Sequence, residues 1–329
     1  MKQTNYLDFI IESLKITLFC LLITGLFKSF GASNNNLLVV FNMAVMSCAA
    51  TFSVEKKNLR HICLGSIVIF LSVAAGGILG YYLPSIGIIL TIFYAGLAFY
   101  FPKTKIISNI FVTGALMFLI FNGLPFPSED GLLYALDGIV LTLLFIVYSW
   151  LFEPPVPLAK TMIMDTNESH RNHIIAFIAV TSLILAAIIS YYLHRHTSLN
   201  HLYWIGLTVL VVIQSSQEKT ILVSIKRIII NAVGAIGIVL LFYYFVSNAF
   251  WVNFAVLTLF LFLIFSLSFS YVGRTLFIEL FVLGLTHLLG NYQVGIAFDR
   301  FYLTLIGGSI VIVTTFVSYL YSAVEESKI

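Results

Sequence analysis

The sequence predicts an all-α, polytopic membrane protein, a bundle of transmembrane helices arranged as two tandem repeats of about six helices each. Three observations indicate this fold class. The 329-residue chain is 60% hydrophobic and only 9% charged, whereas soluble domains carry about 25% charged residues. Its apolar runs are continuous, as in Ile62 to Leu83 and Ile174 to Leu193, and each could cross about 30 Å of hydrocarbon as a helix. Short motifs also recur half a chain length apart.

The spans are expected to be helical, because a barrel would show short segments of alternating hydrophobicity instead of continuous runs. Apolar runs broken by charge, Gly, Pro or Asn give twelve ranges: 14–30, 37–53, 61–83, 85–101, 106–124, 132–152, 173–193, 202–217, 222–246, 249–268, 274–290 and 300–321. The ranges 37–53, 85–101 and 202–217 are short for full crossings. Ten spans is therefore the alternative to about twelve.

The first span is expected to stay as an anchor, because Asp8, Glu12 and Lys15 interrupt the opening and no small-residue cleavage site follows. The basic residues set the orientation, since cytoplasmic loops carry the excess of Lys and Arg. With twelve spans and the N-terminus inside, 14 of the 17 basic residues fall on the inner side, and only Lys28, Arg195 and Arg300 fall outside. We predict that both termini are cytoplasmic and that the chain lies in an inner or plasma membrane.

The repeat is clearest where Ala135-Leu-Asp137 is echoed by Ala297-Phe-Asp299. Similar offsets separate other pairs of short motifs, which indicates a duplicated unit. We therefore expect a first six-helix repeat at 1–152, a cytoplasmic linker at 153–172 and a second six-helix repeat at 173–329. An even number of spans per unit gives both halves the same orientation, with any substrate path near their interface.

The second half carries Tyr203-Trp204, then Lys226-Arg227-Ile228 with Gly234 seven residues past the arginine, and finally Asp299-Arg300 with Thr304 and Gly307 following. In order and spacing this resembles the FUSC family, the fusaric-acid-resistance-like and aromatic-acid-exporter membrane proteins. The family's Gly-Thr after its first arginine is replaced here by Ile230-Asn231. The resemblance implies export of small organic acids, commonly alongside a periplasmic adaptor protein.

Glu279 is the most informative single residue, because it lies within the apolar run Thr275 to Leu289. A charge at such a depth costs about 2.5 kcal/mol or more, so it usually faces a cavity or a partner. One interpretation is a proton-coupling or gating carboxylate, with His287 two turns away as a relay partner. The other is a structural pair with Arg227 or Arg274, or a side chain reaching toward the inner surface.

Arg227 and Arg300 open the helices that carry the family-like motifs, and a guanidinium binds a carboxylate with a bidentate fork. They are candidates for substrate contact. The alternative is an interfacial anchor, with Arg300 pairing with Asp299 or with neighbours of Glu279. Trp204 is a pathway candidate from its motif position, whereas most Tyr residues near span ends form the interfacial belt.

The glycines Gly76 and Gly80 form a GxxxG pair, and Gly234, Gly237, Gly307 and Gly308 give further small patches; all predict close helix packing. Cys20, Cys48 and Cys63 lack the spacing of a disulfide or zinc framework and are interpreted as core residues. We expect no metal and no cofactor.

The sequence therefore predicts a secondary exporter of small organic acids, aromatic carboxylic acids among them, with Glu279 as candidate proton carrier and homo-oligomerisation as an option. No nucleotide-binding or hydrolase motif occurs in the sequence, so enzyme activity is not expected. The positive charges sit in short loops, which argues against nucleic-acid binding. Two alternatives remain open: an anion channel of the same architecture, and a non-transporting subunit that scaffolds an envelope complex.

Overall fold

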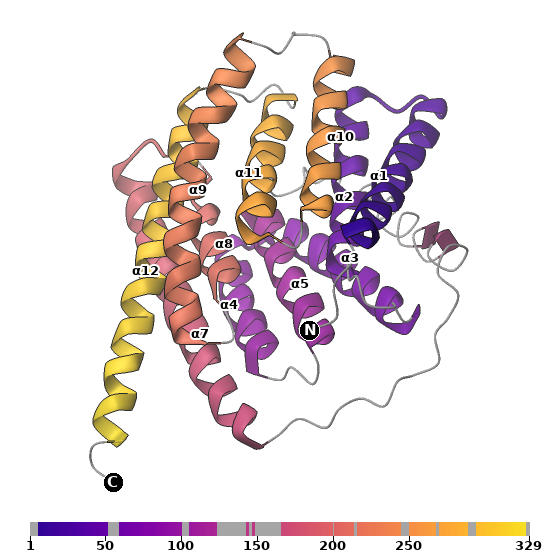
Figure 1. Cartoon of the computed structure of the whole chain (residues 1–329). Helices are drawn as coiled ribbons and strands as arrows, with labels where there is room; N and C mark the ends of the chain where they lie inside the picture. The colour runs from indigo at the N-terminus through magenta and orange to yellow at the C-terminus, as the bar shows by residue number, and fades with distance from the viewer. Residues whose placement is uncertain are drawn as a thin grey trace. The chain divides into compact units, whose positions relative to one another are not determined.

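The structure, a computed structural model, describes residues 6–51, 59–100, 105–123, 143–144, 147–148, 166–199, 201–213, 216–244, 250–267, 270–288 and 294–326. Within these residues the regular structure is helical, and no strand occurs (Figure 1). The helices are α1 (Tyr6–Ser29), α2 (Asn34–Thr51), α3 (Leu59–Tyr82), α4 (Pro84–Tyr100), α5 (Lys105–Gly123), α7 (Thr166–His196), α8 (Tyr203–Val212), α9 (Gln217–Tyr244), α10 (Phe250–Ser266), α11 (Tyr271–Leu288) and α12 (Val294–Glu326).

Each of these helices corresponds to one predicted range, and the remaining range, 132–152, lies almost entirely outside the described residues. The prediction for 202–217 was too long. Helix α8 has 10 residues and ends where Ile213 turns extended, at ψ 126°. Ten residues of helix span about 15 Å, roughly half the hydrocarbon thickness. Conversely, α7 and α12 begin earlier than predicted. The polar residues from Thr166 continue α7 before its apolar run, and α12 begins at Val294, so that Asp299 and Arg300, where the prediction placed the boundary, lie within the helix.

Four helical segments of the described chain are long and apolar enough to cross a membrane: Phe9–Ser29, His173–His196, Gln217–Leu241 and Gly295–Leu320. Five further apolar helices are shorter, with 10–17 residues each. The all-helical membrane architecture is thus confirmed. The total of twelve spans, the repeat and the cytoplasmic termini remain predictions.

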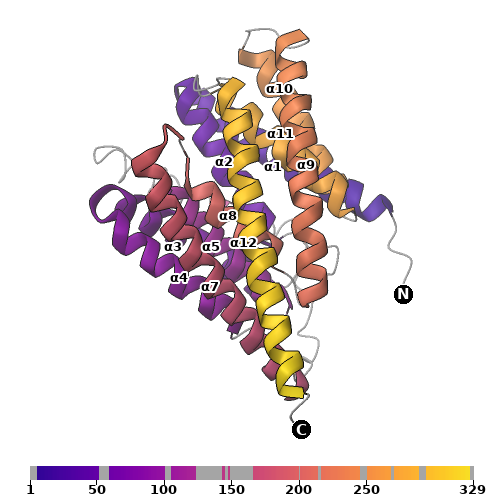
Figure 2. The ribbon, with the colours of Figure 1, turned by 90° about the vertical axis from the view of Figure 1, so that its left-hand side faces the viewer.

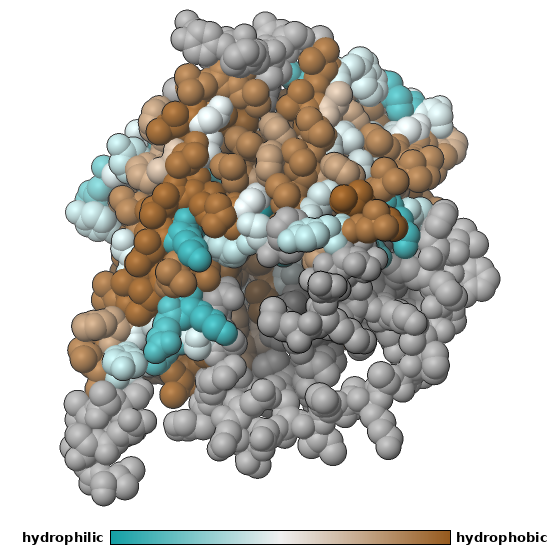
Figure 3. All heavy atoms as spheres, in the orientation of Figure 1, coloured by the Kyte–Doolittle hydropathy of each residue, from teal (hydrophilic) through white to brown (hydrophobic). Residues whose placement is uncertain are grey.

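The exposed surface of the helices is apolar, as lipid contact requires. On α9, the side chains of Ile229, Val233, Ile236 and Leu240 are all exposed and follow one face at helical spacing. Figure 3 shows how apolar side chains dominate the visible surface of the described residues, with hydrophilic ones in small groups. Water would disfavour so much exposed apolar area, and the acyl chains of a bilayer would not.

Local signals fix where several helices begin and end. Gly31 closes α1 in the left-handed region, at φ +87°, and its N–H donates to the carbonyl of Lys28 while that of Ala32 donates to Phe27. This pair of bonds is the Schellman ending, which favours glycine because other residues are strained there. A serine hydroxyl then accepts a backbone N–H at the start of α2 (Ser33), α9 (Ser216) and α11 (Ser270).

The chain forms two compact units, each assembled from separate segments. Unit 1 contains residues 1–66, 136–157 and 229–301, and unit 2 contains 67–135, 158–228 and 302–329. Helices α3, α9 and α12 contribute residues to both units. Each unit draws on both halves of the sequence, so compactness does not follow the order of the chain.

In unit 1, α1 packs against α2 and α10, and α10 packs against α11. The ring of Phe41 on α2 is central, because it lies 5.0 Å from that of Phe254 on α10 and 6.1 Å from that of Phe281 on α11, centroid to centroid. Aromatic pairs at such distances add to the energy gained by burying their area.

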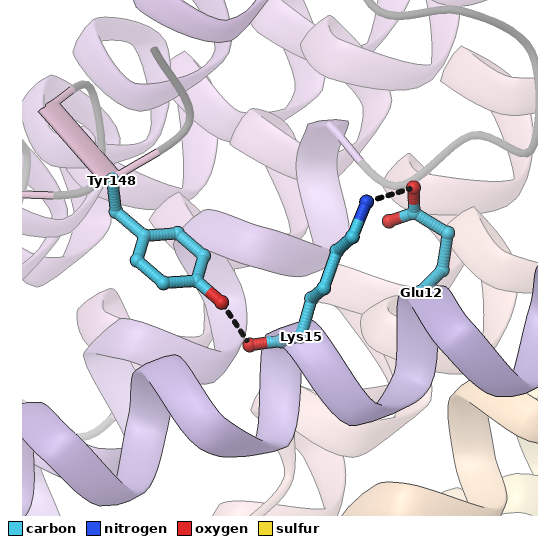
Figure 4. A network of polar contacts seen from close by, with 3 residues as sticks. All are labelled: Glu12, Lys15 and Tyr148. Carbon is cyan, nitrogen blue, oxygen red and sulfur yellow. Dashed lines mark hydrogen bonds and ion pairs between the residues drawn. The ribbon is translucent and has the colours of Figure 1, made fainter. Parts of the chain in front are cut away.

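The charged end of α1 is held by local and tertiary contacts (Figure 4). Lys15 Nζ lies 3.8 Å from Glu12 Oε1, three residues earlier on the same helix, and the hydroxyl of Tyr148 donates to the carbonyl of Lys15 at 2.8 Å. The two charges that interrupt the first apolar run therefore offset each other. Tyr148 is one of the few described residues of the predicted sixth span, and this hydrogen bond shows that its side chain packs against α1.

In unit 2, α4 packs against α5 and α7, and α8 packs against α5 and α7 (Figure 2). The GxxxG pair of α3 packs closely against another helix, α5, as the sequence predicts. A Cβ on Gly76 would lie 2.5 Å from the carbonyl oxygen of Phe118 on α5, and one on Gly80 would lie 2.5 Å from that of Asn122. Only glycine lets the two backbones approach so closely.

Candidate functional site

The candidate site lies in unit 1 and centres on a buried ion pair. Glu279 occupies the middle of α11, and its side chain pairs with Arg300, in the second turn of α12, with Nε and Oε1 2.5 Å apart. Glu279 is 1% exposed and Arg300 3% exposed. Because desolvation of an isolated charge is costly, each group stabilises the charged form of the other in this apolar setting.

Glycine on α9 makes room for the carboxylate. A Cβ built on Gly234 would lie 2.8 Å from Cγ of Glu279 and 3.3 Å from its Cβ. The side chain of Glu279 therefore lies directly against the backbone of α9. Three helices, α9, α11 and α12, thus each supply one member of the site, and the member from α9 acts by having no side chain.

One oxygen of the carboxylate stays without a partner. Oε1 accepts from the Arg300 Nε–H, whereas Oε2 is buried and has no hydrogen-bond partner among the described residues. Buried polar atoms are usually satisfied, and those that are not commonly mark functional positions or places where water or a ligand binds. The pair is consequently held through one hydrogen bond rather than the two of a bidentate fork.

The buried face of α9 is polar in the first half of the helix, from Thr220 to Asn231, opposite its apolar exposed face. It carries Arg227 and Asn231 at successive turns, followed by Gly234, and Arg227 is only 3% exposed. Near the start of the helix, the same face carries Thr220 and Ser224, whose hydroxyls donate hydrogen bonds to backbone carbonyls one turn earlier. A buried polar stripe on a membrane helix is expensive and indicates a functional or close-packing face.

The motif on α12 combines the charge with close packing. Within unit 2, a Cβ on Gly307 would lie 2.7 Å from the carbonyl oxygen of Ile205 on α8, and one on Gly308 would lie 2.8 Å from Ile228. These glycines pack closely, as predicted. The prediction for Gly237 was wrong: among the described residues, and apart from the backbone of α9 itself, no atom lies within 4 Å of a Cβ at that position, because Gly237 is on the exposed face of α9.

The structure places the other predicted site residues as follows. Trp204 is 2% exposed on α8 in unit 2, with its ring centroid 5.0 Å from that of His201. Arg227 is buried rather than exposed as a surface anchor. Asp299 is half-buried beside Arg300. His287 lies on α11, but its side chain is outside the described part, so its relay role stays a prediction.

Sequence reasoning named Glu279 and Arg300 but did not pair them, and offered Arg227 or Arg274 as partners instead. Two signals could have suggested the pair. Both residues interrupt apolar runs of consecutive helices, and two opposite charges in lipid are more stable together than apart. The contact of Gly234 with Glu279 had no such signal, because spacing along α9 says nothing about which helix faces it.

A comparison with known protein families finds one family that matches part of the chain. Residues 185–314 match the family described as fusaric acid resistance protein-like. The matched segment holds all three members of the site, Gly234, Glu279 and Arg300, and confirms the resemblance found in the sequence. No curated protein and no solved structure matches the chain. The apolar helices and the family match indicate a transmembrane protein that is similar to this family over residues 185–314.

Proposed function

We propose that this fusaric acid resistance protein-like membrane protein exports small organic acids, aromatic carboxylic acids among them, across the inner membrane, and that Arg300 binds the carboxylate of the cargo. The observation that supports the proposal is the buried ion pair between Arg300 and Glu279 inside the family-matched segment. Fusaric acid, named in the family description, is itself an aromatic carboxylic acid.

A guanidinium suits this cargo for two reasons. It stays charged at any physiological pH, and it carries five N–H donors, more than one carboxylate can use. In an apolar surrounding its attraction for an anion is stronger than in water, because solvent screens the charge less. The same side chain that now holds Glu279 can therefore hold a cargo carboxylate.

Glu279 supplies the link to an ion gradient, since a carboxylate can carry a proton and an arginine cannot release one. In this proposal the exporter couples the outward movement of the acid to protons through Glu279. Arg227 and Trp204, both buried, are further candidates for the path. A periplasmic adaptor and a homo-oligomer also stay proposals.

The test measures accumulation of radiolabelled fusaric acid and benzoic acid in cells that lack or overproduce the protein. Overproduction is expected to lower accumulation, and Arg300→Gln to restore it to the level of cells without the protein. A hydrogen bond to a charged group contributes about 1.5–3 kcal/mol, so binding should weaken about tenfold or more. Arg195→Gln is the matched control, because Arg195 is exposed at the end of α7 and lies over the ring of Tyr191.

Measurements in the same cells distinguish the exporter from the two alternatives, an anion channel and a scaffolding subunit. Glu279→Gln should abolish export against a gradient, whereas an anion channel would still conduct down one. If neither acid responds to overproduction while the protein is correctly inserted, the exporter proposal is wrong and the scaffolding subunit takes its place.

A further inference from the structure

We infer that unit 2 contains a sodium site at the end of helix α8, formed by backbone carbonyls of α8 and by buried hydroxyls of α7, α9 and α12. The site requires neither the proposed cargo nor the Glu279–Arg300 pair, whose residues belong to unit 1. Three observations carry it: the depth at which α8 ends, the hydroxyls that lie at this depth, and one buried hydroxyl without a partner.

The first observation is that α8 ends within the membrane. A Cβ on Gly307 would lie 2.9 Å from Cβ of Thr208 on α8. Gly307 is in the middle of the membrane span Gly295–Leu320, so Thr208 lies near mid-membrane. The helix continues for about 6 Å past Thr208, to Val212, and the backbone of Ile213 is extended. Helices α7 and α12 run past this end (Figures 1 and 2). The last four carbonyls of a helix have no partner within it, so those of α8 need one at membrane depth.

The second observation is that hydroxyls lie at this depth, and the first comes from α7. Ser190 donates to the carbonyl of Leu202, just before α8, and the side chain of Leu183 lies 3.7 Å from a Cβ built on Gly206. The two helices are therefore antiparallel neighbours. Ser182, one residue further from Ser190 than Leu183, consequently lies beside the second half of α8, and its side chain is fully buried.

Helix α12 brings two more hydroxyls to the same depth. The hydroxyl oxygens of Ser182 and Thr314 are 2.7 Å apart, and Thr314 donates its proton to the carbonyl of Ile310. Since a hydroxyl has one proton, Ser182 is the donor between the two, and its own lone pairs stay available. The third observation concerns the next residue: Thr315 is fully buried, and its hydroxyl has no hydrogen-bond partner among the described residues.

Thr315 is on the face of α12 that packs against α9. A Cβ on Gly308 would lie 2.8 Å from the side chain of Ile228 on α9, and Ser318 accepts a hydrogen bond from Gln217 at 3.2 Å. Thr315 lies between Gly308 and Ser318 on this face of the helix. It therefore faces the first turns of α9, where the two buried hydroxyls of that helix lie.

These groups have the chemistry of a sodium site. Carbonyl and hydroxyl oxygens are ligands of hard cations, and in transporters with discontinuous helices the carbonyl ends of half-helices coordinate sodium. The C-terminal end of a helix also carries a partial negative charge, which favours a cation. The expectation of no metal rested on the spacing of the cysteines, and that spacing does not exclude a site made of carbonyls and hydroxyls.

The nearby charges favour a monovalent ion. Glu218 and Lys219, in the first turn of α9, are exposed, and Arg227 is buried two turns later, about 12 Å along the helix axis. This buried charge is positive, and it repels a divalent ion twice as strongly as sodium. Close packing at Gly307 and Gly308 keeps α8 and α9 near α12, which favours sodium over the larger potassium ion.

The experiment measures equilibrium binding of radiolabelled sodium to the purified full chain in lipid nanodiscs, in choline chloride buffer without organic acid. Wild type should bind sodium saturably, and excess unlabelled sodium should displace the label, whereas the same excess of potassium should not. Thr315→Val replaces the unpartnered hydroxyl by a methyl group and should weaken binding about tenfold or more, because a contact with a charged group is lost. Ser182→Ala should also weaken binding, and it provides the test if Thr315→Val does not fold.

Thr24→Val is the matched control. Thr24 is a buried threonine of unit 1 whose hydroxyl donates to the carbonyl of Cys20, and its variant should bind sodium as wild type does. Sodium should also raise the melting temperature of wild type but not that of Thr315→Val, since a ligand stabilises the state that binds it.

Three results would each overturn the sodium site. They are no saturable binding by wild type, equal displacement of the label by potassium, and binding that neither Thr315→Val nor Ser182→Ala weakens. Because no organic acid is present in the measurement, each of these results leaves the proposed export standing. Failure of the export test in cells likewise leaves sodium binding to be measured on its own.

Discussion

Among the helix contacts of the described chain that depend on glycine, two differ in what the glycine faces. On α3, Gly76 and Gly80 face backbone carbonyls of α5, 2.5 Å from where a Cβ would lie. On α9, Gly234 faces the side-chain carbons of Glu279. A backbone cannot move without its helix, whereas a side chain can change rotamer. The first contact therefore fixes two helices, and the second positions a carboxylate.

Both contacts are buried in apolar surroundings, but only one contains charge. The α3 contact is made by close packing alone, the usual means of association in lipid, where no hydrophobic force acts between helices. The α11 contact joins Glu279 to Arg300 and leaves one oxygen without a partner. A site that retains so costly a pair in lipid is explained better by function than by stability.

The largest effect is expected from removing one charge of the pair. Arg300→Leu should lower the free energy of unfolding by about 3–5 kcal/mol, because it leaves an unpaired buried carboxylate. The double variant Arg300→Leu with Glu279→Leu should lose less than this single one. Thermal or denaturant unfolding of the purified protein checks both, and a double variant less stable than the single would contradict the assignment of cost to the unpaired charge.

Lys15→Met provides the control for that experiment. Its ion pair with Glu12 spans 3.8 Å on one helix, and the Lys15 side chain is 32% exposed. Both side chains of this pair are half-buried, so Lys15→Met should cost less than the loss of a fully buried partner. A loss as large as that of Arg300→Leu would show that burial does not separate the two ion pairs.

The next effect is expected at the backbone contact. Gly76→Ala should cost about 1–3 kcal/mol, the range for overpacking, since α5 would have to shift as a whole. Gly237→Ala is the matched control: it has open space and should gain up to about 1 kcal/mol from helix propensity. Unfolding midpoints of the two variants that do not differ would contradict close packing between α3 and α5.

The smallest effect is expected at Gly234. Gly234→Ala should cost about 1 kcal/mol, because the methyl group meets a side chain that can rotate. The cost of Gly234→Ala should be smaller in a Glu279→Ala background, which removes the Cγ that the methyl group meets, whereas no side-chain change on α5 can rescue Gly76→Ala. Additive losses in a double-mutant cycle of Gly234 and Glu279 would contradict the contact.

The comparison also shows how well the sequence predicted which glycines pack against another helix. The GxxxG spacing at Gly76 and Gly80 correctly predicted close packing, because that spacing puts both glycines on one face of α3. The same reasoning failed at Gly237, which points away from the bundle. The presence of glycine does not show which side of a helix packs against a neighbour. The large apolar residues that repeat on the same face of α9 as Gly237 indicate a lipid-facing side and could have corrected the prediction for Gly237.

The sequence by itself determined that the chain is helical, that it lies in a membrane and where nearly all the described helices fall. These properties follow from terms that each segment contributes on its own: the transfer energy of its side chains, and the need of every backbone group for a partner within the segment. The end of α8 at Val212 was missed, because the run remains apolar past the point where the backbone becomes extended.

Only the tertiary structure decided which charges meet. The sequence offered Arg227 or Arg274 as the ion-pair partner of Glu279 and assigned Arg300 elsewhere. In the structure Glu279 and Arg300 form the buried pair, and Gly234 of a third helix makes room for it. Side chains on separate helices become neighbours through the packing of whole helices, which depends on many contacts at once. The residues that carry the proposed function were visible in the sequence, whereas their arrangement was set by the fold.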